Sequence, residues 1–145
     1  MKFLVIFLLI FLVGCAKNFN KNLSEVSIGS GKKLIKINAE IADDSNEMEK
    51  GLMFREKLNE NDGMLFVFDD ESYQAFWMKN TLIPLDMIFI DKNFEIIDIK
   101  NAHPCKVEPC DLYKSAKPAK YVLEVNGGFA AKNNIKTGDK LIKNK

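Results

Sequence analysis

Two residues stand out in this sequence because of where their charges occur. Arg55 is the only arginine among 21 basic residues. A guanidinium binds a carboxylate or phosphate through two parallel hydrogen bonds, which a lysine ammonium cannot do. Asp86 lies within an apolar run, where a carboxylate must be paired or hydrogen-bonded because burying a bare charge is costly. The structural alternative for Arg55 is that it pairs with an internal carboxylate and holds the end of a helix to the sheet. Asp86 is the natural candidate partner, and we expect it either to neutralise Arg55 or Lys79 or to line a pocket beside them.

A second group of candidate residues lies in one short segment. Trp77 and Lys79 would share one face of a strand, which places an indole beside a cation, and Asn80 adds an amide at the end of that strand. Aromatic rings with a few convergent polar groups are typical of small-molecule sites. The structural alternative is that Trp77 fills the core, Lys79 is solvated and Asn80 shapes a turn.

Glu124 interrupts another apolar run and faces away from its neighbours Leu123 and Val125. It could join Asp86 as a pair of carboxylates for acid–base catalysis or for binding a cation. The alternative is a single acid that points to solvent or forms hydrogen bonds with a loop. The sequence contains no nucleophile elbow, phosphate loop or metalloprotease helix, so a catalytic function has little support.

Cys105 and Cys110 form a close pair, preceded by the only histidine, His103. One imidazole and two thiolates could bind zinc or copper. However, each cysteine follows a proline, and a close pair in an exported protein is more often a disulfide. We therefore predict a Cys105–Cys110 disulfide, with no bound metal and no other cofactor.

The first fifteen residues predict export. Lys2 provides a basic start and residues 3–13 form an unbroken apolar run, as in a secretory signal peptide. This run is too short to cross a bilayer as a stable helix. The following Leu-Val-Gly-Cys resembles a bacterial lipobox, which implies that Cys15 is lipidated and becomes the new N-terminus. Ala16, in place of the aspartate that retains many lipoproteins at the inner membrane, favours the outer membrane where the cell has two.

The remaining chain is predicted to be a neutral, single-domain protein. We interpret residues 1–14 as the signal peptide, 15–32 as a lipidated, flexible tether rich in Asn, Lys, Ser and Gly, and 33–145 as the globular domain. Without Lys2 the chain has 20 basic and 20 acidic residues. This balance argues against a nucleic-acid partner, which needs a concentrated basic face. We expect a monomer.

Strands dominate the expected secondary structure. Alternating or continuous apolar runs bounded by turn residues predict strands over residues 33–42, 64–68, 74–79, 85–90, 94–100, 120–126 and 140–143. A short helix should follow Asp44, with Glu47 in the capping-box position, and a second should run from Gly127 through Lys132. These elements predict a mainly β (α+β) domain, a partly closed barrel or sandwich of about seven strands with two short helices.

Several blocks of the sequence resemble the family known as domain of unknown function 192. They are residues 49–55 (EKGLMFR), 63–68 (GMLFVF), 76–86 (FWMKNTLIPLD), 121–128 (YVLEVNGG) and 135–139 (IKTGD). The block at 76–86 is the most distinctive, and the match covers about residues 40–142 in order. One departure is Lys50, where the family usually has arginine. The resemblance implies a compact β-rich fold that is often exported, and it implies no activity.

Three functions are compatible with these residues. The first is a lipid-anchored envelope domain that binds a small ligand bearing a carboxylate or phosphate. Its predicted binding residues are Arg55, Trp77, Lys79, Asn80, Asp86 and Glu124. The second is an interaction module whose aromatic edge meets another envelope protein. The third is an enzyme with Asp86 and Glu124 as acid and base. In each case the lipid on Cys15 would bind the membrane.

Overall fold

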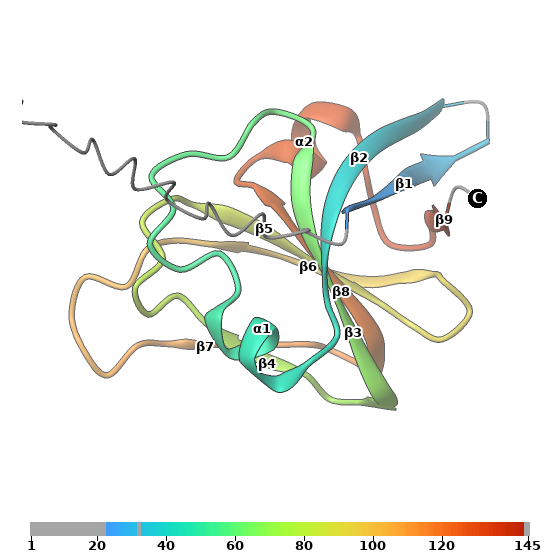
Figure 1. The fold of residues 1–145 in the computed structure, drawn as a ribbon. Helices are drawn as coiled ribbons and strands as arrows, with labels where there is room; N and C mark the ends of the chain where they lie inside the picture. The colour runs from blue at the N-terminus through green and yellow to red at the C-terminus, as the bar shows by residue number, and fades with distance from the viewer. Residues whose placement is uncertain (1–22, 32, 144–145) are drawn as a thin grey trace, which may run out of the picture.

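The computed structural model describes residues 23–31 and 33–143, which form nine strands and two short helices (Figure 1). The elements are β1 (Leu23–Ser30), β2 (Lys33–Ala42), α1 (Ser45–Lys50), β3 (Asp62–Ser72), β4 (Ala75–Trp77), β5 (Leu85–Ile90), β6 (Ile96–Ala102), β7 (Leu112–Lys114), β8 (Ala119–Asn126), α2 (Phe129–Asn133) and β9 (Lys140–Lys143). Neither of these helices has the length and apolar character needed to cross a membrane. The predicted signal peptide and Cys15 lie outside the described residues.

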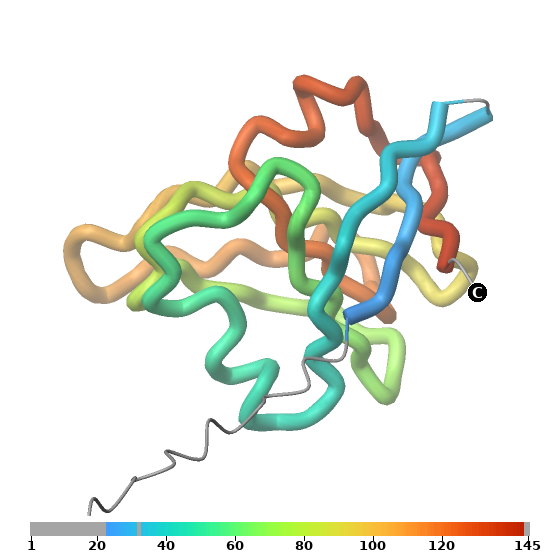
Figure 2. The backbone as a smooth tube through the Cα atoms, turned by 45° about the horizontal axis from the view of Figure 1, so that its top comes forward, coloured from blue at the N-terminus to red at the C-terminus, as the bar shows by residue number. Residues whose placement is uncertain are grey.

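Seven strands form one curled sheet, in the order β6-β5-β8-β3-β2-β1-β9. Only β2 and β3 pair in parallel within it; the other neighbours are antiparallel. The curl brings the two edges together at one end, where Ile96 donates to the Asp139 carbonyl and Leu141 donates to the Phe94 carbonyl, both at 2.9 Å. Figure 2 shows β9 returning beside β1 at this end. The prediction of a mainly β, partly closed barrel is confirmed as a half-barrel.

Strands β5 and β8 and the first half of β3 are buried on both faces, because each face of the sheet has its own core. Every residue of β5 is buried, as expected for a strand covered on both sides. One core lies inside the curl and includes Phe129 and Ala130 of α2. The second lies on the opposite face, under α1 and the two-stranded β4–β7 ribbon. The candidate site is in this second layer.

The predicted tether is wrong over residues 23–30, because these residues form β1. Val26 and Ile28 are fully buried, and β1 pairs with both β2 and β9. The Ser and Gly content of this segment concealed the strand. Gly29 has a φ of +138° and lies so close to Lys33 that a Cβ would approach the Lys33 carbonyl oxygen to 2.3 Å. The glycine therefore serves a tight β1–β2 hairpin rather than a flexible linker.

The helix predicted after Asp44 is present and short. The Asp44 carboxylate accepts a hydrogen bond from the Glu47 backbone N–H at 2.8 Å, which satisfies one of the N–H groups left free at a helix start. Gly51 ends the helix with a φ of +47°, a conformation that residues with a Cβ rarely adopt. The chain then turns back toward the sheet and leaves α1 as one wall of a cleft.

Candidate ligand-binding cleft

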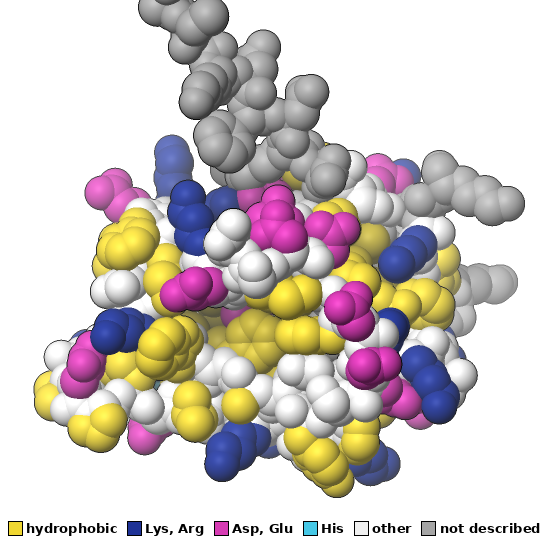
Figure 3. All heavy atoms as spheres, turned by 60° about the horizontal axis from the view of Figure 1, so that its bottom comes forward, with side chains coloured by type: hydrophobic (Ala, Val, Ile, Leu, Met, Phe, Trp, Pro, Cys, Tyr) yellow, Lys and Arg dark blue, Asp and Glu magenta, His cyan; other side chains and the backbone are white. Residues whose placement is uncertain are grey.

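A cleft with a volume of about 250 Å³ lies between α1 and β4, above the sheet. Its aromatic walls are Phe66 and Phe68 of β3 together with Phe76 and Trp77 of β4. Figure 3 turns this side of the molecule forward and shows hydrophobic side chains gathered in a hollow on this face. Because aromatic rings and methylene groups make up most of the lining, the cleft suits a ligand with an apolar body.

Glu124 of β8 is the acid at the bottom of this cleft. Its side chain is on the cleft face, flanked in register by Met64 of β3 and Met87 of β5. The residue is only 4% exposed. None of the described residues forms a hydrogen bond or ion pair with its carboxyl group. Every side-chain oxygen that is fully enclosed in the described part of the chain has a hydrogen-bond partner. The carboxyl oxygens of Glu124 have none, so they are not fully enclosed and open onto the cleft.

Burial raises the pKa of Glu124 to about 8. The cause is desolvation, which disfavours the charged carboxylate, and no nearby donor or cation offsets it. The carboxyl group is therefore mostly protonated and uncharged at pH 7. A perturbed acid in an apolar cleft is a typical mark of a functional site.

The outer end of the cleft opens toward a second hollow of about 420 Å³, and the two share Trp77 as a wall. Phe54 and Asn80 line this outer part, and both adopt positive φ angles, of 63° and 56°. The Phe54 N–H donates to the Asn80 carbonyl at 2.8 Å, which holds the two strained residues together. Left-handed backbone at residues with side chains costs free energy and is concentrated at functional sites.

The cation predicted beside the indole is present. The Lys79 ammonium lies 5.6 Å from the centroid of the Trp77 ring, within the range of a cation–π contact. The same ammonium forms an ion pair with Glu108 at 2.8 Å. The rim also carries Glu49 and Lys50 of α1. Trp77, Lys79 and Asn80 therefore all line the outer part of the cleft.

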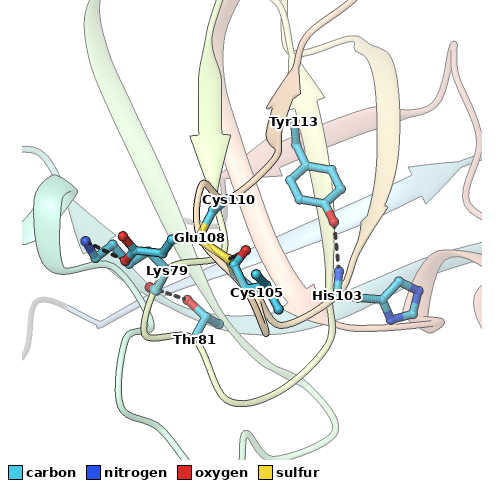
Figure 4. The surroundings of a disulfide bond; sticks show 8 residues. Lys79, Thr81, His103, Cys105, Glu108, Cys110 and Tyr113 are labelled. Carbon is cyan, nitrogen blue, oxygen red and sulfur yellow. Dashed lines mark hydrogen bonds and ion pairs between the residues drawn. A yellow bond between two sulfur atoms is a disulfide. The ribbon is translucent and has the colours of Figure 1, made fainter.

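The predicted disulfide between Cys105 and Cys110 is present, with a Cα–Cα distance of 5.6 Å. It closes the loop that carries Glu108, and the Cys105 N–H donates to the Met78 carbonyl at 3.4 Å. Figure 4 shows this loop beside Lys79, with the imidazole of His103 turned away from the sulfurs. Within residues 23–31 and 33–143, no group of three or more His, Cys, Asp or Glu side chains could hold a metal ion.

Arg55 pairs with an internal carboxylate, as the structural alternative predicted, but the expectation that Asp86 is this partner is wrong. Arg55 instead binds Glu40 of β2 through two parallel hydrogen bonds of 2.5 Å. These bonds raise the pKa of Arg55 above its ordinary value, so the guanidinium stays charged. Arg55 is not among the residues that line the cleft. Its guanidinium fixes the segment after α1 to strand β2 of the sheet.

Asp86 also lies away from the cleft. Its carboxylate accepts hydrogen bonds from the backbone N–H groups of Gly128 and Ala130, at 3.0 and 2.8 Å, and from the Asn101 amide at 2.7 Å. These bonds hold the start of α2 against the sheet. Asp86 pairs in register with Val125, the neighbour of Glu124. Successive strand residues point to opposite faces, so the predicted pair of Asp86 and Glu124 carboxylates does not form.

Sequence reasoning missed most of the cleft walls. Met48 and Met53, from α1 and the turn after it, line the cleft with Phe66, Phe68 and Phe76. A signal was present, because these residues lie within or beside the blocks at 49–55, 63–68 and 76–86 that carry the family resemblance. A sequence alone does not reveal which apolar residues of such blocks face a cavity and which belong to the core.

Comparisons with known proteins agree with the fold. The family DUF192, described as "Uncharacterized ACR", matches residues 26–142. A crystal structure of a candidate transcription regulator from Sinorhizobium meliloti 1021 is 34% identical, covers 85% of this chain and 95% of that one, and superposes with a TM-score of 0.79. A protein of unknown function from Novosphingobium aromaticivorans DSM 12444 is 38% identical, with coverage of 82% and 84% and a TM-score of 0.76. No curated protein matches the chain.

Proposed function

The chain belongs to the uncharacterised family DUF192, and we propose that its domain binds a small ligand in the cleft between α1 and β4. The observation that carries this proposal is the carboxyl group of Glu124, which is buried, has no partner among the described residues and opens onto an aromatic cleft. A buried polar group without a partner costs stability. A ligand that supplies the missing hydrogen bonds would remove that cost.

The dimensions and lining of the cleft restrict the ligand. A volume of about 250 Å³ lies just below the range of about 300–1,000 Å³ typical of drug-sized ligands, which indicates a smaller molecule. Five of the six methionines line the cleft or pack beneath it, at positions 48, 53, 64, 78 and 87. Methionine side chains adapt to irregular shapes, so the walls suit a flexible apolar body.

A carboxylate or phosphate on the ligand would bind at the rim. Lys79 and Asn80 line the outer hollow, and Lys50 lies at both openings. Lys79 is already paired with the exposed Glu108, and an exposed pair contributes little stability. The ligand's anionic group can therefore replace Glu108 at little cost. Arg55, engaged by Glu40, has no part in this site.

A thermal-shift screen of small aromatic and aliphatic metabolites on the full-length protein tests the proposal. A specific ligand stabilises the fold by about 2.7 kcal/mol at a hundredfold excess over Kd. Trp77, the only tryptophan, should report binding by fluorescence. Ala75→Trp places a bulky side chain in the cleft wall and should abolish the shift. Ala116→Trp, at an exposed position that does not line the cleft, is the matched control and should retain it. Equal shifts in both variants would contradict binding in this cleft.

An interaction module remains a second candidate because large apolar side chains surround the mouth of the cleft. Phe54 is 65% exposed, Trp77 47% and Leu112 54%, and Trp77 pairs in register with Leu112. Exposed apolar groups that gather on one face commonly mark binding surfaces. Leu112→Lys should abolish binding of a protein partner. The same change should leave binding of a small ligand intact, because Leu112 does not line the cleft.

We further propose that the domain is exported and held at the bacterial membrane by lipid on Cys15. The signal-like residues 1–14 support export, and the Cys105–Cys110 disulfide suits an oxidising compartment. Cell fractionation tests the anchor directly. The protein should be found with membranes, and Cys15→Ser should release it. A variant that stays in the membrane fraction would contradict anchoring through this cysteine.

A further inference from the structure

The ionisable residues that line the cleft favour a positive group on the ligand. There are three in its lining, of which Glu49 and Glu124 are acids and Lys50 is a base. Glu49 and Lys50 are exposed on α1, and Glu124 is the one at the floor. The aromatic walls reinforce this preference, because ring faces attract cations. The Lys79 ammonium beside the Trp77 ring shows that these walls accept one.

We infer, on the premise that the cleft binds a small ligand as proposed above, that this ligand carries a protonated primary or secondary amine that binds the Glu124 carboxylate. The amine N–H groups donate to the two carboxyl oxygens that have no partner among the described residues. The apolar body of the ligand then lies against Phe66, Phe76 and Trp77. Charge-assisted hydrogen bonds of this kind are stronger than neutral ones.

An amine fits the floor better than an anion does. A protonated carboxyl group donates one hydrogen bond, and Met64 and Met87, its neighbours in register, offer none. An anion at the floor would therefore gain only one hydrogen bond from Glu124 in exchange for its hydration. An ammonium instead replaces the proton: Glu124 releases H⁺ to solvent and its carboxylate pairs with the ligand's charge. The net charge of the floor is then the same before and after binding.

Proton release makes the binding depend on pH. With a pKa of about 8 for Glu124, the ionised fraction rises about 50-fold between pH 6 and pH 8. The nearest charges across the sheet are already in ion pairs, Glu40 with Arg55 and Lys100 with Asp98. Strand β4, which forms the wall opposite α1, has no ionisable side chain. The groups that face Glu124 from α1 are the exposed rim residues Glu49 and Lys50.

Calorimetric titration of the full-length protein tests the amine. The probes are phenylalkylamines with one to four methylene groups, each compared with the alcohol of the same length, at pH 6, 7 and 8. We expect amine affinity to rise about 50-fold from pH 6 to pH 8, with proton release seen in buffers of different ionisation enthalpy. Alcohol affinity should stay constant.

Glu124→Gln supplies the matched variant, because glutamine has the same shape as the protonated acid. It should lower amine affinity at pH 8 by about 10–100-fold, remove the pH dependence and leave alcohol binding unchanged. Equal affinity for amine and alcohol at pH 8 would refute the proposal that the ligand carries an amine, and the proposed binding of a small ligand would still hold. An unchanged amine affinity in Glu124→Gln would lead to the same conclusion. If neither the amines nor the alcohols bind, the proposal of an amine ligand is refuted, and the result also counts against the cleft as a ligand site.

Discussion

Replacing Glu124 with glutamine should stabilise the protein at neutral and alkaline pH. Burial raises the pKa of this carboxyl group from 4.5 to about 8 in the folded state. The folded protein therefore binds the proton more tightly than the unfolded chain does. Stability is lost as the pH rises through the window between these two values, because deprotonation favours the unfolded state. Glutamine has no proton to lose and should avoid this loss.

The size of the effect follows from the same two pKa values. Each pH unit within the window costs about 1.4 kcal/mol. The penalty that Glu124 imposes is then about 1 kcal/mol at pH 5, about 3 kcal/mol at pH 7 and about 4 kcal/mol at pH 8. The gap between the two proteins should therefore widen by about 3–4 kcal/mol from pH 5 to pH 8. Such a gain is large against a typical total stability of about 5–15 kcal/mol.

Urea unfolding at pH 5, 6, 7 and 8, followed by Trp77 fluorescence, measures this gap. Comparing the two proteins at each pH cancels the titration of all other groups. Glu49→Gln is the matched control, because Glu49 lines the same cleft from an exposed position. It should produce no widening. A constant gap between wild type and Glu124→Gln across this range would refute the reasoning, as would a variant that is less stable than wild type at pH 8.

Three further changes test the residues that position the cleft, each by urea unfolding. Asp86→Ala removes the acceptor of three hydrogen bonds and should cost about 3–5 kcal/mol; a loss below 1 kcal/mol would contradict its anchoring role. Arg55→Lys keeps the charge but loses the two parallel bonds to Glu40 and should cost about 1–3 kcal/mol, whereas full stability would show that an ammonium suffices. A chain that starts at residue 33 lacks β1 and should not fold, because β1 buries Val26 and Ile28 completely and each such side chain contributes about 1.5–3 kcal/mol. A chain that starts at residue 23 keeps β1, so it is the control and should fold.

Strands with continuous apolar sequence could be predicted because their own residues specify them. Residues 85–90, which are apolar apart from Asp86, were predicted as a strand with the bounds they have in β5. The shorter run 140–143, with two apolar residues between lysines, was also predicted with the bounds of β9. The strand β1 could not be predicted, because its Ser and Gly residues are typical of linkers and its stability comes from pairing with β2 and β9. β7, with three residues, depends in the same way on its partner β4. Strands defined by their neighbours leave a weak signal in their own sequence.

The candidate site could be predicted in part. Glu124 was singled out because an acid interrupts an apolar run, and Trp77 with Lys79 because of their spacing; the structure places all three at one cleft. The partners of Arg55 and Asp86 could not be predicted. Glu40 lies 15 residues before Arg55, and the α2 backbone lies more than 40 residues after Asp86. Contacts over such separations depend on the topology of the sheet, which sequence patterns alone do not define.

Carboxyl ¹³C NMR of protein labelled at glutamate tests most directly whether Glu124 is an acid poised to bind an amine. Comparison with Glu124→Gln assigns its signal. We predict one glutamate that titrates near pH 8 in the free protein and at a lower pH when a phenylalkylamine is bound. A Glu124 signal that titrates below pH 6 in the free protein, or that does not move when the amine is added, would contradict the account.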